Sequence, residues 1–448
     1  DVANCGIEDA DHAVGIARTA FESGAWANMA PADRKMVLVR WAELIEEHAD
    51  EIALLECLDV GKPISDTTGV DVPSAIRTIR WSGEAIDKVY DEIPPTPADT
   101  LALVQRLPLG VVAAIVPWNF PLSTTAWKLA PSLATGNSVI LKPASNTPLS
   151  ALRIAGLATE AGLPDGVLQV LPGPGGSLGR HLSLHEEIDG LTFTGSTEIG
   201  KQLMRYSGES NLKRTFLELG GKSPNIVFAD SNLEKAATFA AIAVFYNGGQ
   251  TCTAGTRLIV EDSIRKRFVE MVVEKSRDWM PGNPLDPATA MGPMIDAAQL
   301  KTVADYVDIG QEEGASLMFG GKQAMADSGG CYYEPTVFDG VNNDMQIARE
   351  EIFGPVLSVI GFKDVEEAVR TANDSIYGLA GAVWCTNINV AHKVAAAVRV
   401  GTMGINNYCG GDITVPFGGF KQSGNGRDKS MHAFDDHTEL KTTWIEFD

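Results

Sequence analysis

Residues 191–202 read LTFTGSTEIGKQ, which predicts a short apolar strand, a glycine-containing loop and the start of a helix, in that order. Backbone amides at such a helix start can hold a pyrophosphate. The segment nearly matches the phosphate loop G-x-x-x-x-G-K-[ST] of nucleotide hydrolases, but Gln202 stands where a hydroxyl should bind magnesium. Residues 173–178 nearly match a dinucleotide fingerprint, but Leu178 replaces its third glycine. Glycine spacing alone therefore leaves open whether either loop binds phosphate.

Short apolar runs alternate with helical patterns on both sides of this segment. Apolar residues recur at three- and four-residue spacing over 34–58, and a second helical pattern over 150–161 ends at Gly162-Leu163-Pro164. This alternation predicts an α/β protein with parallel strands and crossover helices. Prolines gather within residues 89–99, which predicts an exposed or edge segment. The apolar runs are 111–116, 138–141, 167–171, 190–194 and 225–228.

Composition indicates an ordinary enzyme rather than a binder of polyanions. The 448 residues carry a net charge of −22, and 44% of them are hydrophobic. The acidic balance disfavours nucleic acid and anionic lipid as partners, and no apolar run is long enough to span a bilayer. Six cysteines without paired spacing suggest reduced thiols and a cytoplasmic protein. One of them, Cys409, is expected to be an inert thiol near a late glycine-rich loop.

Cys252 is the candidate nucleophile. It lies in YNGGQTCTAG, residues 246–255, where glycines and small polar residues replace the apolar neighbours of a core thiol. Glu218 lies 34 residues upstream in FLELGGK, at the end of a mostly apolar strand. A thiol and an isolated carboxylate suggest a nucleophile with a general base. The alternatives are a small packing residue for Cys252 and a paired structural carboxylate for Glu218.

Several segments, read together, resemble the aldehyde dehydrogenase superfamily over nearly the whole chain. The resemblance implies a cysteine enzyme with two Rossmann-like parallel-sheet domains and a small β oligomerisation flap. The matching segments are VPWNFPL (116–122), LKP (141–143), residues 193–200, ELGGK (218–222), residues 250–254, EIFGP (351–355) and PFGG (416–419).

The resemblance also implies a division of the chain. Residues 1–88 and 109–218 would form the dinucleotide-binding domain, and residues 219–437 the catalytic domain. Residues 89–108 and 438–448 would form the flap and make a homodimer or a homotetramer.

In this family pattern Cys252 attacks the aldehyde, and the side-chain amide of Asn119 with the backbone N–H of Cys252 stabilises the alkoxide. Glu218 deprotonates the water that cleaves the thioester, which favours a free acid as product. The resemblance gives Lys128 and Glu439 a supporting role in proton movement.

The same resemblance assigns the binding of NAD or NADP. Its residues are Trp118 along the cleft, Lys142 at the adenosine ribose, Gly195 and Ser196 near the pyrophosphate, and Glu351 with Phe353 at the nicotinamide ribose. Many members have Glu three residues after the lysine, but Ser145 stands there in this chain. Because this removes like-charge repulsion against a 2′-phosphate, we expect NADP to be tolerated or preferred.

Residues 411–417 and 421–430 look most like aminoaldehyde oxidisers, such as the gamma-glutamyl-gamma-aminobutyraldehyde and guanidinobutyraldehyde enzymes of polyamine catabolism. Glu84, Asp87 and Asp412 are the acids expected to line the tunnel mouth and attract an ω-amine. Their alternative is a solvated acidic surface. Another aliphatic aldehyde or a semialdehyde remains an alternative substrate.

A metal site and two rival functions are disfavoured. His181 and His185 stand four apart, but Leu182 occupies the glutamate position of a zinc helix and the sequence shows no third ligand. We therefore expect no metal. A P-loop nucleotide hydrolase is disfavoured by Gln202, and a catalytically silent member of the fold by the presence of both Cys252 and Glu218.

Overall fold

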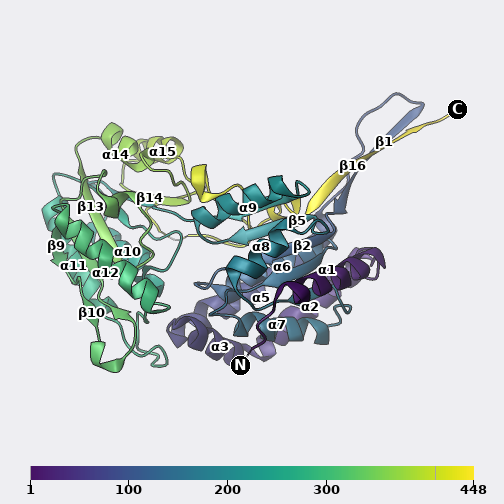
Figure 1. Ribbon diagram of the computed structural model, residues 1–448. Helices are drawn as coiled ribbons and strands as arrows, with labels where there is room; N and C mark the ends of the chain where they lie inside the picture. Colours follow the sequence, from purple (N-terminus) through teal and green to yellow (C-terminus); the bar gives the residue numbers. More distant parts are fainter. Residues whose placement is uncertain (1, 409) are drawn as a thin grey trace.

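The computed structural model describes residues 2–408 and 410–448, so the expected inert thiol Cys409 lies outside the described residues. Two bodies are each built on their own mainly parallel sheet, and a two-stranded arm projects away from them (Figure 1). This confirms the predicted α/β class with two parallel sheets and a small β flap.

The first sheet consists of β2 (Val111–Ile115), β3 (Ser138–Lys142), β4 (Leu168–Val170), β5 (Gly190–Thr194) and β6 (Arg214–Glu218), all parallel. Their order in space is β4-β3-β2-β5-β6. The chain adds strands on one side of β2 and then crosses to the other side, so β2 and β5 flank the topological switch point. Parallel sheets open a binding crevice at the carboxyl ends of the strands there.

Helices cover this sheet and extend it on one side. The expected helix over 34–58 is wrong as a single element, because His48 leaves the helical conformation with φ −107° and ψ 20° and separates two helices. A one-residue break preserves the apolar spacing, so periodicity could not reveal it. The helical segments are α1 (Ile7–Glu22), α2 (Pro31–Glu47), α3 (Ala49–Val60), α4 (Ile64–Asp66), η1 (Thr67–Asp71), α5 (Val72–Ala85), η2 (Ile86–Lys88), α6 (Pro121–Ala134), α7 (Leu149–Glu160), η3 (Gly175–Gly179), α8 (Arg180–Leu184) and α9 (Thr197–Glu209).

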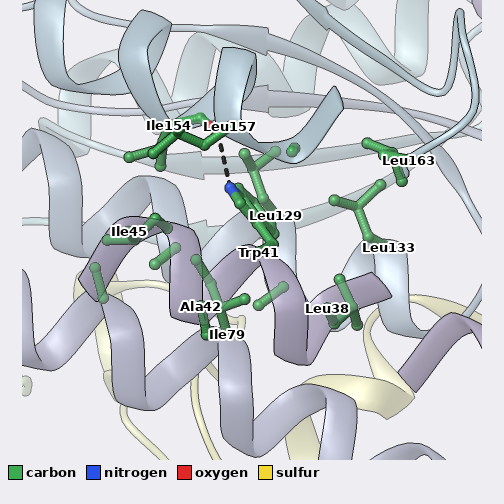
Figure 2. Close-up of a cluster of buried hydrophobic side chains, with 14 of the residues drawn as sticks. Leu38, Trp41, Ala42, Ile45, Ile79, Leu129, Leu133, Ile154, Leu157 and Leu163 are labelled. Carbon is green, nitrogen blue, oxygen red and sulfur yellow. Dashed lines mark hydrogen bonds between the residues drawn. The ribbon is translucent and has the colours of Figure 1, made fainter. Parts of the chain in front are cut away.

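The core between these helices is centred on Trp41 of α2 (Figure 2). Its indole Nε1 donates a hydrogen bond of 2.7 Å to the carbonyl of Ile154 on α7, and its ring packs near Leu129 of α6. The one polar atom of the side chain is therefore satisfied inside an apolar cluster.

The second sheet has the order β15-β14-β7-β8-β13-β12-β9, in which β9 alone runs antiparallel to its neighbour. Side chains of Asn232, Asp296, Asp364 and Asn387 accept backbone N–H groups and fix the starts of four helices of this body. The strands are β7 (Pro224–Val227), β8 (Arg257–Glu261), β9 (Ser316–Phe319), β12 (Thr336–Asp339), β13 (Val356–Phe362), β14 (Ala380–Trp384) and β15 (Thr402–Ile405). The remaining elements are α10 (Leu233–Phe245), η4 (Tyr246–Gly249), α11 (Arg265–Ser276), η5 (Arg277–Trp279), α12 (Ala297–Glu312), the hairpin of β10 (Gln323–Ala324) and β11 (Tyr332–Tyr333) with η6 (Ala326–Ser328), α13 (Gln346–Arg349), α14 (Val365–Asn373) and α15 (Ile388–Ala397).

The last part of the chain returns to the first body. It contains η7 (Lys421–Ser423), α16 (His432–Asp435) and β16 (Thr438–Glu446), which pairs antiparallel with β1 (Thr100–Pro108) to form the arm. Phe434 of α16 joins the core around Trp41. The division of the chain into domains stays a prediction. The predicted end of the catalytic domain at residue 437 disagrees with the packing, because α16 lies before that residue and packs against the first body.

Among the described residues, none of the helices combines the length and apolar character needed to cross a lipid bilayer.

Candidate active site

A cavity of about 510 Å³ is lined by residues from both bodies. Parts of its wall follow directly after β2, β5 and β6, which places it at the switch point of the first sheet. Most of the predicted catalytic and cofactor residues meet there although they are far apart in the sequence. They are Trp118, Asn119, Gly195, Ser196, Glu218, Cys252, Glu351 and Phe353.

The loop that carries Cys252 has a constrained backbone. It follows η4, in which Asn247, Gly248 and Gly249 all have positive φ angles of 50°, 61° and 73°. A Cβ atom at Gly249 would lie 2.1 Å from the carbonyl oxygen of Gly354, so only glycine fits there. These turns hold the thiol at the cavity wall.

Asn119 is fixed to the same loop. Its Nδ2 donates to the carbonyl of Gln250 at 2.8 Å, and Nδ2 of Asn247 donates to the carbonyl of Asn119 at 3.1 Å. A side-chain amide carries two N–H groups, so the second one of Asn119 is available at the cavity. Asn119 can therefore donate to an oxygen atom bound beside Cys252.

Glu218 and Cys252 both lie in surroundings that favour their neutral forms. Burial, reinforced by Asp428, raises the pKa of Glu218 well above its usual value, and neither carboxylate oxygen has a hydrogen-bond partner among the described residues. Burial also raises the pKa of the Cys252 thiol to about 12, with further contributions from Glu351 and Glu218. The thiol therefore keeps its proton at neutral pH and needs a base to become a nucleophile.

Lys128 and Glu439, which were predicted to assist proton movement together, lie in different parts of the structure. Lys128 is buried on α6, and its Nζ lies 2.8 Å and 2.9 Å from the two carboxylate oxygens of Asp428. Glu439 lies on β16 in the arm, where it pairs with Arg214 at 2.6 Å, so its expected catalytic role is wrong. The carboxylate beside Lys128 is Asp428, which the sequence signals only as part of the glycine-rich tail KQSGNGRDKS.

The residues predicted to hold the first half of a dinucleotide follow strands of the first sheet. Lys142 ends β3, and its Nζ donates a hydrogen bond of 3.0 Å to the carbonyl of Pro143. Burial lowers the pKa of Lys142 to about 8. The Ser145 hydroxyl donates to the carbonyl of Gly173 at 2.9 Å. Neither Lys142 nor Ser145 is among the described residues that line the cavity itself.

Ser196 accepts the backbone N–H of Ile199 at 3.3 Å and caps the start of α9. The positive end of that helix therefore lies at the cavity, where it favours a phosphate. Lys142 keeps further N–H donors for a ribose or phosphate oxygen. The residues present thus fit the adenosine and pyrophosphate parts of a dinucleotide.

Glu351 also lines the cavity. Its Oε1 accepts the backbone N–H of Gly221 at 2.9 Å, and burial raises its pKa to about 7. The rings of Trp118 and Phe353 meet edge to face with centroids 5.3 Å apart. The carboxylate of Glu351, which lines the same cavity as these rings, can accept hydrogen bonds from a ribose, which fits the nicotinamide half of the cofactor.

The acids expected at the substrate mouth do not line the cavity within the described part of the chain. Asp87 pairs with Lys35 and Lys88, Asp412 pairs with Arg77, and Glu84 is exposed. For Glu84 and Asp87 the prediction is wrong, because the positions of the 67–88 region that line the cavity are Val70, Asp71 and Ser74. Glu84 lies about 15 Å further along α5, at 1.5 Å per residue. Asp412 acts on the charge of Lys429, which lines the cavity, so the place of Asp412 at the mouth stays a prediction.

Two charged groups that sequence reasoning missed do line the substrate end. Asp71 is buried and pairs with Lys62, whose Nζ lies 2.8 Å from the carboxylate. Lys429 also lines the cavity, beside the rings of Trp127 and Phe417. The sequence offered one signal for Lys429, namely its place two residues after Arg427 in the quoted tail.

Asp11 supplies the third group that the sequence did not show beside His181 and His185. Its Oδ1 lies 2.5 Å from Nε2 of His181 and 3.5 Å from Nε2 of His185. The backbone N–H of Glu187 donates to Nδ1 of His185 at 3.1 Å. Because Nδ1 accepts, the neutral ring carries its proton on Nε2 and donates toward Asp11 instead of binding a metal. The absence of a metal stays a prediction.

The fold and the cysteine cavity agree with a comparison to known families. Residues 1–443 match the model of the aldehyde dehydrogenase family, and the chain belongs to that family. Its members oxidise aldehydes with NAD or NADP, so the predicted resemblance and the predicted enzyme class are confirmed.

Three similar proteins show how close these relations are. The NADP/NAD-dependent aldehyde dehydrogenase PuuC of Escherichia coli (strain K12) is 52% identical over 98% of this chain and 88% of its own length. The aminoacetaldehyde dehydrogenase of Pseudomonas aeruginosa is 45% identical over 99% and 89%. The structure of P. syringae AldA, an indole-3-acetaldehyde dehydrogenase in complex with NAD+ and IAA, has a TM-score of 0.99 and 60% identity over 100% of this chain and 90% of that chain.

Proposed function

We propose that the protein oxidises an ω-aminoaldehyde to its carboxylic acid with NAD or NADP. The observation that carries this proposal is that Cys252, Asn119 and the unpartnered carboxyl of Glu218 face one cavity. The names of two relatives support a substrate that contains an amino group. One is the aminoacetaldehyde dehydrogenase, and the other is a gamma-glutamyl-gamma-aminobutyraldehyde dehydrogenase of known structure that is 55% identical.

The first step is attack by sulfur. Once Cys252 loses its proton, the thiolate forms a C–S bond with the aldehyde carbon and negative charge develops on the aldehyde oxygen. The free N–H of Asn119 and the backbone N–H of Cys252 donate to that oxygen. The loss of one such donor typically raises the barrier by about 2.7–4 kcal/mol. When bound, NAD or NADP supplies the acceptor for the hydride that the thiohemiacetal releases.

The second step is hydrolysis of the thioester left on Cys252. Glu218 has two oxygens without hydrogen-bond partners among the described residues, so one of them can accept a proton from an attacking water. The raised pKa makes the ionised carboxylate a stronger base than an exposed one. Cleavage of the C–S bond then releases the acid and restores the thiol.

Lys128 and Asp428 act through Glu218 and are positioning residues. Asp428 raises the pKa of Glu218, whereas Lys128 lowers it. Because the two are held as a buried pair at 2.8 Å, their opposing effects stay in fixed proportion. They set the strength of the base without touching the substrate.

The choice of dinucleotide depends on Ser145. With no carboxylate at this position, a 2′-phosphate meets no like charge, and Lys142 adds an opposite one. We expect activity with both NAD and NADP, measured as kcat/KM for each dinucleotide at saturating aldehyde. Ser145→Glu should lower the NADP value about tenfold relative to the NAD value, a difference of about 1.4 kcal/mol. A wild-type enzyme that refuses NADP would contradict this proposal.

We infer that the arm of β1 and β16 joins copies of the chain into a homodimer or a homotetramer, because it carries exposed apolar side chains. A cytoplasmic location is supported by the cysteines, since the five in the described part of the chain are all free thiols.

The catalytic assignment is tested by assaying a panel of aldehydes with each dinucleotide. Cys252→Ala should abolish formation of reduced dinucleotide, whereas Glu218→Gln should allow one rapid turnover and then stall at the thioester. Glu234→Gln is the matched control, because Glu234 is a surface carboxylate paired with Lys275. Steady turnover of any aldehyde by Cys252→Ala would refute the mechanism.

A further inference from the structure

The amine of Lys429 is held in the wall of the active-site cavity by aromatic faces. Its Nζ lies 4.3 Å from the ring centroid of Trp127 and 5.4 Å from that of Phe417. All three side chains line the cavity together with Cys252. In the described part of the chain Lys429 makes no hydrogen bond or ion pair, and ring faces neutralise a cation only partly.

The backbone fixes this lysine in place. Lys429 and Ser430 have φ angles of 64° and 54°, which are unfavourable for residues with side chains and persist only when the surroundings impose them. Asp428 forms a backbone bridge with Phe417, and the N–H of Ser430 donates to the carbonyl of Ile413 at 2.7 Å. The amine is therefore placed at the cavity before any substrate arrives.

Asp428 and Asp412, the two carboxylates that act on the charge of Lys429, already have cationic partners, and so does Asp71, which lines the same cavity. Burial lowers the pKa of Lys429, against the opposing effects of Asp428, Asp412 and Cys252, so the site still lacks a full counter-charge. The occupied carboxylates are in the pairs Lys128–Asp428 at 2.8 Å, Arg77–Asp412 at 3.3 Å and Lys62–Asp71 at 2.8 Å. Glu218 and Glu351 also line the cavity, but burial raises the pKa of each carboxyl and favours its neutral form. A negative group on a substrate would therefore supply the missing counter-charge.

We propose that Lys429 selects aldehydes by the charge at the end remote from the aldehyde, favouring a carboxylate and disfavouring a free ammonium group. This rests on the proposed function and narrows it to aldehydes with an acidic tail, including aminoaldehydes whose nitrogen is acylated by a group that carries a carboxylate. Acylation removes the ammonium charge, and the carboxylate pairs with Nζ of Lys429.

The test uses three aldehydes of matched length and fixed charge: 5-oxopentanoate, pentanal and 4-trimethylaminobutanal. The wild-type enzyme should show a higher kcat/KM for 5-oxopentanoate than for the quaternary ammonium aldehyde. In Lys429→Met the value for 5-oxopentanoate should fall about tenfold to a hundredfold, mainly through KM, because a charge-assisted hydrogen bond is lost. The value for the ammonium aldehyde should rise in the same variant.

Two controls make the result specific. Lys429→Arg keeps the charge and should keep the preference for the anion, and Lys266→Met removes a charge from an exposed position on α11 and should leave the ratio of the two charged aldehydes unchanged. A wild-type enzyme that prefers the cationic aldehyde, or a Lys429→Met variant with an unchanged ratio, overturns the inference. A wild-type enzyme that oxidises no aldehyde would instead refute the proposed function.

Discussion

The pKa of Cys252 determines how the enzyme should respond to pH. Burial and two carboxylates raise it to about 12, so the reactive thiolate fraction increases about tenfold for each pH unit below that value. We predict that the rate of the first turnover, measured by stopped flow as formation of reduced dinucleotide, increases continuously from about pH 6 to pH 9. A rate that is independent of pH over this interval would show that the thiol ionises more easily.

Glu218 adds a second, testable effect at the same site. Glu218→Gln removes a carboxyl that raises the pKa of Cys252, so the pH dependence of the first turnover should shift toward lower pH. Glu234→Gln, the surface control, should give the wild-type profile. An unshifted profile in Glu218→Gln would mean that the charge of Glu218 does not act on the thiol.

The sequence predicted correctly those site residues that lie in short, recognisable motifs. Cys252, Glu218 and Asn119 each stand in a short segment with glycine or proline neighbours, and the fold brings all three to one cavity. The prediction failed for Glu439 and for the acids at 84 and 87. Glu439 lies on β16, whose pairing with β1 is a long-range contact that local spacing does not encode. Glu84 and Asp87 lie further along the chain than residues 70–74, which reach the cavity.

At the level of elements, Trp41 connects α2 to α7. Trp41→Ala should lower the free energy of unfolding by about 3–5 kcal/mol, because a buried aromatic side chain and its packing contacts are lost. Trp41→Phe should lower it by about 1–3 kcal/mol, since the carbonyl of Ile154 loses its donor. Denaturant unfolding of both variants measures these changes.

Trp444→Ala is the comparison for this experiment, because Trp444 lies on the exposed arm. It should change the free energy of unfolding of the isolated chain by less than about 1 kcal/mol. If Trp41→Ala were no more destabilising than Trp444→Ala, the cluster in Figure 2 would not be the main support of the first body.

The strands of the first sheet could be predicted to within a residue or two, because strands buried on both faces read as continuous apolar runs. β2, for example, covers Val111–Ile115 where residues 111–116 were expected. The helix over 34–58 could not be divided correctly, because His48 interrupts the backbone without interrupting the apolar pattern. The spacing of apolar residues thus predicts the buried face of an element more accurately than it predicts the residue at which the element ends.

At the scale of the whole molecule, the arm has strand edges and apolar side chains that a single chain leaves uncovered. Among the described strands β1 and β16 pair with each other, and one further bridge joins Val104 of β1 to Glu92 (Figure 1). A two-stranded ribbon alone has little stability in water. Leu440 and Trp444 are 60% and 58% exposed, and Ile93 nearby in the sequence of the arm is 72% exposed. Unpaired strand edges and exposed apolar side chains favour association with a second copy.

Side chains alternate between the two faces of β16, which allows a matched experiment. Leu440 and Trp444 share one face, whereas Thr443 lies on the other. We predict that Leu440→Asp combined with Trp444→Asp reduces the mass of the assembly in sedimentation velocity, because charges replace apolar groups at the contact between copies. Thr443→Asp, which adds one charge to the opposite face, should have a much smaller effect. Equal masses for wild type and the double variant would place the contact between copies elsewhere than on this face of the arm.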